Sequence, residues 1–203
     1  LMRSSAASDV YKRQVYWSDV MKKGKFVIIS GPSGVGKDTI CDELVKKGVG
    51  RYSVSMTTRK KRSNEIEGIS YFFVSKEEFE RHIEEDYFLE YAMYNGNYYG
   101  TPNEFIKETT NNGDNVIAIL EIKGAINAKK IFSDAITIFI MPPSFDELKK
   151  RLRSRKSEDD SIINERLNIA KEEIKYKDKY DYVVINNTVD EAVLEIENII
   201  NNC

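Results

Sequence analysis

Short apolar runs recur along the chain and are separated by segments in which apolar residues follow a helical spacing. The runs are rich in Val, Ile and Phe and carry few charges, which is typical of strands buried on both faces of a sheet. They lie at residues 26–30, 116–122, 136–141 and 182–185. From residue 102 onward helix and strand alternate, which favours parallel strands joined by helical crossovers. The pattern predicts an α/β fold, a parallel-sheet core with helices on both faces.

Capping residues mark the ends of several predicted helices. A helix over residues 103–113 would be capped by its first residue, an asparagine, and ended by its last, a glycine. Ser144 with Glu147, and Thr188 with Glu191, have the spacing of a capping box, in which each side chain bonds the other residue's backbone N–H. We therefore expect helices to begin just after Ser144 and Thr188.

Residues 52–101 follow a different pattern, with aromatic and β-branched stretches. The predicted strands lie at residues 52–56, 69–74 and 88–94. Asn95-Gly96 is a strong signal for a hairpin turn, and a helix is expected over residues 76–86. This part of the chain is predicted to be a small β-rich lobe. Further on, residues 153–160 are charged and free of apolar side chains, which suits a mobile cover over a site.

The composition limits the class of protein. The chain has 203 residues, enough for one domain with small inserted lobes, and its 31 Lys and Arg nearly balance its 33 Asp and Glu. The balance argues against a dedicated nucleic-acid binder. Two cysteines indicate neither a disulfide framework nor a metal site.

The chain has neither a membrane span nor the apolar centre of a signal peptide, so we expect a cytoplasmic protein with no membrane partner. The sequence leaves open whether it is a monomer or a homo-oligomer. Residues 1–20 are small, polar and aperiodic. They are interpreted either as a non-native or disordered leader before a natural start at Met21, or as a genuine short extension.

A glycine-rich segment after the first strand carries the clearest chemistry. Residues 31–38 read GPSGVGKD and precede a predicted helix, so the glycines let the backbone wrap a polyphosphate at a helix N-terminus. The alternative is an ordinary glycine-rich turn with a solvated lysine. The candidate ATP-binding residues are Gly31, Pro32, Ser33, Gly34, Val35, Gly36, Lys37, Asp38 and Thr39. Lys37 would reach the β and γ phosphates.

Asp38 departs from the usual pattern, because a Ser or Thr that touches Mg²⁺ normally follows the lysine. An ionised Asp38 could hold the metal through water or could repel the phosphates. Thr39 follows one position later.

A second set of polar residues lies in the predicted lobe. Arg59 and Arg62 stand three apart beside hydroxyl residues in the segment SMTTRKKR, and arginine forks suit a phosphate dianion. Taken alone, this basic run would be a solvated face or an address signal. Glu65, Tyr71, Glu90, Tyr99 and Thr101 follow it in the same lobe.

With these residues in place, the chain closely resembles the guanylate kinase family across residues 21–202. The stretches that carry the resemblance are ISGPSGVGK, SVSMTTRKKR, GISYFFVSKEEF, FLEYAMYNGNYYGT, IFIMPPSFDELKKRL, NERL and DYVVIN. The resemblance implies a P-loop NTPase fold of the nucleoside monophosphate kinase type. Its parts would be a core of residues 21–51, 102–152 and 167–202, a GMP-binding lobe of about 52–101, and a helical lid of about 153–166.

The resemblance also implies roles for single residues. The GMP-binding residues would be Ser55, Arg59, Arg62, Glu65, Tyr71, Glu90, Tyr99, Thr101 and Glu121. Lys37, Arg59, Arg155 and Arg166 would act on the transferring phosphoryl group, and Asn186 would lie near adenine. Mg²⁺ would accompany ATP, with Asp38 as the candidate contact. Where the family has two acids two apart, Glu121 replaces one and Ile119 leaves the other missing. The lid reads Arg-Ser-Arg-Lys where Gly-Arg-Gly is usual, which predicts stiffer hinging.

The chemistry of guanine agrees with these roles. Guanine offers N1–H and a 2-amino group to Glu90 and its O6 to the hydroxyls of Ser55 and Thr101, whereas adenine reverses that pattern. An ionised phosphate acceptor needs no catalytic base. We therefore expect transfer of the ATP γ-phosphate to GMP, and to dGMP, giving GDP and ADP. The alternatives are a guanylate-kinase-like module that binds a phosphopeptide and a kinase for a phosphorylated sugar.

Overall fold

The computed structural model describes residues 23–63, 65–94, 96–154 and 160–203. The predicted leader at residues 1–20 and the expected start at Met21 lie outside the described residues. Within the described part of the chain, no helix is long and apolar enough to cross a membrane.

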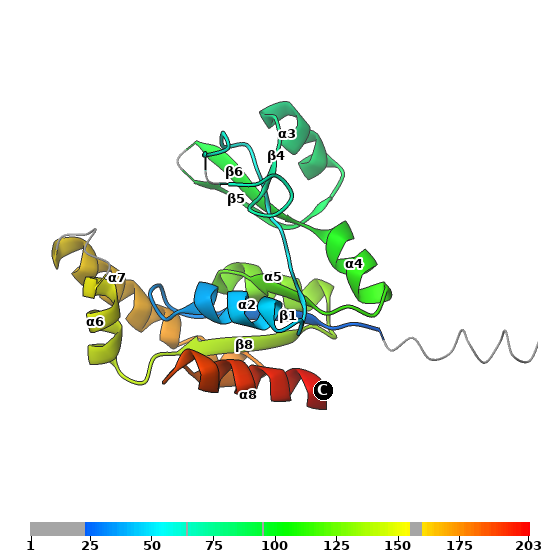
Figure 1. The fold of residues 1–203 in the computed structure, drawn as a ribbon. Coiled ribbons are helices and arrows are strands. Elements are labelled where there is room, and N and C mark those ends of the chain that lie inside the picture. Colours follow the sequence, from blue (N-terminus) through cyan, green and yellow to red (C-terminus); the bar gives the residue numbers. More distant parts are fainter. Residues whose placement is uncertain (1–22, 64, 95, 155–159) are drawn as a thin grey trace, which may run out of the picture.

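A five-stranded parallel sheet forms the core (Figure 1). Its order is β2-β7-β1-β8-β9, and every neighbouring pair is parallel. The strands are β1 (Phe26–Ser30), β2 (Arg51–Tyr52), β7 (Val116–Ile119), β8 (Ile136–Met141) and β9 (Tyr182–Ile185). The central strand β1 is buried along its whole length, as its continuous apolar run predicted.

Helices cover both faces of this sheet, which confirms the predicted fold class. Because side chains alternate along a strand, Val27 and Ile29 of β1 pack with α2 (Lys37–Lys46) and α8 (Val189–Asn202). Phe26 and Ile28 point the other way, into a second cluster with α4 (Asn103–Asn111) and α5 (Ile122–Ile131).

The predicted lobe is a separate four-stranded sheet with the order β4-β3-β6-β5, and it stands away from the core in Figure 1. Its elements are β3 (Met56–Thr57), β4 (Phe72–Phe73), α3 (Lys76–Glu84), β5 (Phe88–Tyr94) and β6 (Asn97–Pro102). Phe79 of α3 stacks on Phe88 and Tyr98 with ring centroids 4.3 and 5.1 Å apart. β5 and β6 form the predicted hairpin, with Gly96 in the left-handed conformation (φ 73°).

A helical pair, α6 (Phe145–Ser154) and α7 (Asp160–Ile174), projects from the core on another side (Figure 1). Leu148, Leu152, Ile163 and Ala170 hold the two helices together. The predicted lid of residues 153–166 comprises the end of α6 and the first half of α7, with residues 155–159 outside the described residues. A short helix η1 (Lys177–Lys179) links α7 to β9.

Most predicted helix starts are confirmed. Ser144 Oγ accepts from the Glu147 N–H at 3.1 Å, and Thr188 Oγ1 accepts from the Glu191 N–H at 3.3 Å. The predicted cap at residue 103 is wrong, because Asn103 is already helical and Pro102 takes the cap position without a side-chain bond.

Three predicted strands are shorter than expected. Of the stretch 116–122 only Val116–Ile119 is a strand, because the chain leaves the sheet at the carboxyl end of β7 and Ile122 already begins α5. The stretch 52–56 divides between β2 in the core and β3 in the lobe, since the chain passes between the two sheets there. Of the stretch 69–74, only Phe72–Phe73 pairs as a strand.

Candidate active site

The glycine-rich loop joins the carboxyl end of β1 to the first turn of α2. Gly31, Gly34 and Gly36 all have positive φ, at 148°, 84° and 99°. Position 36 requires glycine for a second reason as well, because a Cβ atom there would lie 2.7 Å from Asn186 Nδ2. The loop therefore places backbone N–H groups at the N-terminus of a ten-residue helix, an arrangement that favours a phosphate group. Of the remaining loop residues, Pro32 and Val35 are buried and Ser33 is exposed.

Lys37 is the first residue of α2 and folds back over this loop. Its Nζ donates to the carbonyl oxygens of Gly31 (2.7 Å) and Pro32 (3.1 Å). Burial lowers the pKa of Lys37, while the nearby carboxylates of Asp38 and Glu173 act in the opposite direction. The ammonium group is thus held at the mouth of the loop, close to the space that the loop encloses.

Asp38 and Thr39 lie exposed in the first turn of α2. A carboxylate at this position is stabilised by the helix dipole. Among the described residues, no group of three or more acidic, His or Cys side chains converges as a metal site. Mg²⁺ in nucleotide sites is held largely by phosphates and water, so an exposed Asp38 and the exposed Glu121 fit contacts through water rather than a protein cage.

Asn186 follows β9 and is only 2% exposed. Its Nδ2 donates to the Val35 carbonyl at 2.8 Å, whereas its Oδ1 is buried without a hydrogen-bond partner. Arg151 of α6 reinforces this contact by donating to the Asn186 carbonyl at 3.1 Å and to the Val35 carbonyl at 3.5 Å. The structure therefore places the predicted adenine residue against the phosphate loop, which it clamps to the end of β9.

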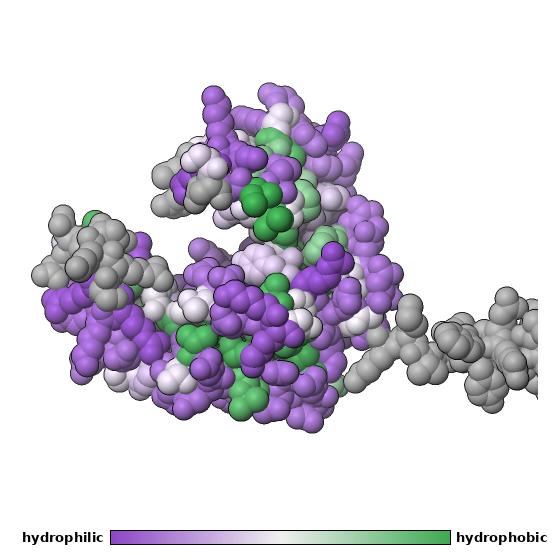
Figure 2. All heavy atoms as spheres, in the orientation of Figure 1, coloured by the Kyte–Doolittle hydropathy of each residue, from purple (hydrophilic) through white to green (hydrophobic). Residues whose placement is uncertain are grey.

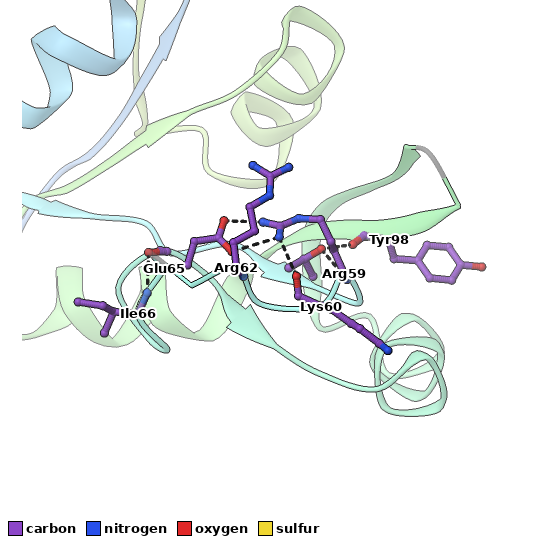
Figure 3. Close-up of polar contacts among 8 residues, drawn as sticks. Arg59, Lys60, Arg62, Glu65, Ile66 and Tyr98 are labelled. Atoms are coloured by element: carbon purple, nitrogen blue, oxygen red, sulfur yellow. Dashed lines mark hydrogen bonds and ion pairs between the residues drawn. The ribbon is translucent and has the colours of Figure 1, made fainter.

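The two predicted arginines of the lobe have different surroundings (Figure 3). Arg59 forms a two-pronged ion pair with Glu65, at 3.1 Å from Nη1 to Oε2 and 2.6 Å from Nη2 to Oε1. The backbone N–H of Arg62 donates to the same carboxylate at 2.7 Å. In Figure 3 the Arg62 guanidinium extends away from Glu65, and this side chain is exposed.

Two tyrosines complete this end of the lobe. The Arg59 guanidinium lies 5.6 Å from the centre of the Tyr71 ring, and the rings of Tyr71 and Tyr99 are 6.0 Å apart. The hydrogen bonds with Glu65 raise the pKa of Arg59, and those from Arg59 and the Arg62 N–H lower the pKa of Glu65. Glu65 is thereby placed as the orienting partner of Arg59, with its side chain turned to the arginine.

A second carboxylate cluster lies where the lobe meets the core. Glu90 on β5 pairs across the hairpin with Thr101, whose hydroxyl is 3.5 Å from Oε1. Burial raises the pKa of Glu90, and the nearby Glu121 raises it further. Ser55 is half-buried at the entry to β3. The predicted guanine residues Glu90, Thr101 and Glu121 are thus brought together.

Figure 2 shows a hollow between the lobe and the α6–α7 pair. Arg155 lies outside the described residues, and Arg166 is a half-buried residue of α7 that already has interaction partners. Glu173, two turns further along α7, has its Oε2 buried without a partner and lies near the Ser33 N–H and Lys37. A cavity of about 540 Å³ between α5 and α7 is lined by Glu121 and Glu173 among others.

Sequence reasoning gave no role to two residues of this site, Arg151 and Glu173. Each acts on a partner distant in sequence, so no local motif marks it. The spacing offers one signal, because Glu173 stands seven residues after Arg166 and therefore on the same side of α7.

Comparisons with known proteins agree with this geometry. The family model described as guanylate kinase matches residues 23–203. The chain is 49% identical to a guanylate kinase of Clostridium acetobutylicum over 179 residues, which is 88% of this chain and 86% of that protein. It is 46% identical to one from Halalkalibacterium halodurans over 180 residues, 88% of each chain. A crystal structure of guanylate kinase from Anaplasma phagocytophilum superposes with a TM-score of 0.69 at 32% identity, covering 89% of this chain and 86% of that one.

Proposed function

Because the chain belongs to the guanylate kinase family and has guanylate kinase activity, we propose how its own residues transfer the γ-phosphate of ATP to GMP. The observation that carries the proposal is the presence of two sites: a phosphate loop in the core and a half-buried carboxylate, Glu90, where the lobe meets the core. We propose that three parts move relative to one another: the core, the lobe of residues 52–101 and the lid of residues 153–166.

Glu90 is proposed to read guanine. An ionised carboxylate accepts from N1–H and the 2-amino group together. Burial and the nearby Glu121 raise the pKa of Glu90, and donors from a bound guanine would favour its ionised form. Thr101, with Ser55, supplies hydroxyls to O6. Adenine would leave these buried groups unpaired, and a site of this kind rejects the wrong base by roughly 10⁴-fold or more. The same contacts accept dGMP, since none of them involves the ribose.

Arg59 is proposed to hold the acceptor phosphate. Glu65 and the Tyr71 ring fix its guanidinium, so little side-chain entropy remains to be lost when a phosphate binds. Arg62 and Tyr99 add a second cation and a hydroxyl at the same end of the lobe. The hydrogen-bond partners of Glu90 and Arg59 differ, so the base and the phosphate are assigned to different residues of the lobe.

The donor phosphates are proposed to bind in the loop of residues 31–36, with Lys37 on the β and γ phosphates. Arg166 and Arg155 would approach as the lid closes, and Arg59 would complete the set of cations around the transferring group. Asp38 and Glu121 would hold Mg²⁺ through water, and the ion would neutralise charge on the donor phosphates. Positioning and charge neutralisation carry the reaction, since the acceptor phosphate is already ionised.

A coupled ADP-release assay with ATP and Mg²⁺ tests this proposal, using GMP, dGMP, AMP, CMP and UMP as separate acceptors. Turnover confined to GMP and dGMP is expected. Equal turnover with AMP would refute base reading by Glu90. ATP binding without turnover on any of them would instead favour a kinase for a phosphorylated sugar, and loss of ATP binding would favour a phosphopeptide-binding module.

A further inference from the structure

Gly124 occupies an unusual place next to Glu90. It is the third residue of α5, is buried, and faces β5 of the lobe. A Cβ atom built at Gly124 would lie 2.0 Å from Glu90 Oε2 and 2.7 Å from its Cδ. The carboxylate of Glu90 thus fills the space that any other side chain at position 124 would occupy.

The backbone of β5 holds Glu90 in this space. Phe88 packs into the lobe cluster and Leu89, 5% exposed, packs into the core cluster with Ala125 and Ala128 of α5. The strand register shifts between Phe88 and Glu90, and such irregularities re-aim a side chain. Because Leu89 is anchored in the core, the position of Glu90 relative to α5 is fixed by packing.

Two neighbours border the carboxylate of Glu90. Thr101 Oγ1 lies 3.5 Å from Oε1 on the lobe side, and the first turn of α5 lies against Oε2. That turn carries N–H groups without intrahelical acceptors, which favours a carboxylate there. A Cβ atom at position 124 would have to displace Oε2 by more than 1 Å to reach an ordinary contact distance.

We propose that Gly124 is a positioning residue for guanine recognition, which sets the depth of Glu90 in the acceptor site. The inference rests on the proposed role of Glu90 in reading guanine. Gly124 touches no substrate and acts through Glu90. Specificity for the 2-amino group therefore depends on the absence of a side chain at Gly124 in the core as well as on the Glu90 carboxylate of the lobe.

Gly124→Ala tests this directly, with GMP and IMP as acceptors because IMP lacks the 2-amino group. We expect kcat/KM for GMP to fall about 10- to 100-fold, since a displacement of about 1 Å costs on the order of 10²-fold. The preference for GMP over IMP should fall, and the KM for ATP should stay within twofold. The variant should fold, because alanine favours a helix over glycine and the clashing group is the end of a flexible side chain.

Two further measurements separate positioning from damage to the fold. In a Glu90→Ala background, adding Gly124→Ala should change kcat/KM for GMP less than twofold, because the group that it displaces is gone. Gly48→Ala is the matched control, since a Cβ there meets nothing within 4 Å. It should lower the unfolding temperature, because its φ of 73° is strained for alanine, and leave the preference for GMP over IMP unchanged.

The inference is overturned if Gly124→Ala keeps the wild-type preference for GMP over IMP. It is also overturned if Gly124→Ala lowers kcat/KM for GMP as much in the Glu90→Ala background as it does in the wild type. A lowered unfolding temperature of Gly124→Ala with equal losses for both acceptors would also overturn it. Failure of the proposed function would appear elsewhere, as absent turnover of GMP by the wild-type chain.

Discussion

Asn186→Ala tests how the phosphate loop is held. The change removes the hydrogen bond from Nδ2 to the Val35 carbonyl, which is part of a fully buried residue. A net hydrogen bond contributes about 1 kcal/mol, and a buried carbonyl left unpaired costs about 1–3 kcal/mol. Arg151 Nη1, at 3.5 Å, still partly satisfies that carbonyl, and the unpaired Oδ1 is removed as well. We therefore expect the free energy of unfolding to fall by about 2 kcal/mol.

The loss is measurable by urea and thermal unfolding. For a domain of this size, about 2 kcal/mol corresponds to a fall in Tm of roughly 4–8 °C. Because the variant loosens the loop that binds phosphate, KM should rise about tenfold for ATP and by a similar factor for GTP offered as the donor. The matched control is Asn187→Ala, which removes the same side chain at an exposed neighbouring position and should leave stability and both KM values within twofold.

The alternative outcome identifies a different role for Asn186. If Asn186→Ala leaves the free energy of unfolding unchanged but weakens ATP selectively over GTP, the side chain reads adenine and the clamp is not its function. That result would refute the reasoning from the Val35 contact and support the role that the family resemblance implies.

Three further predictions concern the charged residues of the site. Burial and Glu121 raise the folded-state pKa of Glu90 above its unfolded value, so the free energy of unfolding falls as pH rises through that raised pKa. Glu90→Gln should therefore unfold at a higher urea concentration than wild type at pH 7.5 but not at pH 4. The reverse order at pH 7.5 would contradict the assigned cause. Arg59→Lys should raise KM for GMP at least tenfold while leaving KM for ATP within twofold, because an ammonium cannot reproduce the fork that Glu65 holds; an unchanged KM for GMP would remove Arg59 from the acceptor site. Asp38→Ser should keep or raise activity at saturating Mg²⁺, since serine restores the usual metal contact. A collapse of activity, measured by ADP release, would show that serine cannot replace the Asp38 carboxylate.

The sequence predicted the fold class because its signals were local. A continuous apolar run marks β1, capping pairs mark α6 and α8, and Asn-Gly marks the β5–β6 hairpin. One error came where the chain passes between two sheets. Residues 52–56 alternate like one strand, yet the first residue pairs in the core and the last in the lobe, and periodicity carries no information about such a crossing.

The candidate site was predicted as a set of chemical groups but not as a network. Glu65 was expected to bind GMP, and in the structure its carboxylate pairs with Arg59, six residues earlier, a contact that the sequence pattern did not predict. Asn186 was expected near adenine and lies against Val35, 151 positions earlier in the chain. No role was predicted for Gly124, because only the packing of β5 on α5 reveals that the Glu90 carboxylate fills the space of a side chain at position 124.

The charges around Lys37 suggest why this site is built to close. Asp38, Glu173 and Glu121 all lie near enough to stabilise its charged form, so a phosphate that enters meets carboxylates as well as the ammonium group. Glu173 shares one side of α7 with Arg166, seven residues earlier, so this side of the helix carries both a carboxylate and a guanidinium. Under the proposed mechanism the lid moves relative to the phosphate loop, and the balance between these two charges at the loop would change with that motion. Closure would then bring Arg166 to the phosphates at the step when the transferred charge must be offset.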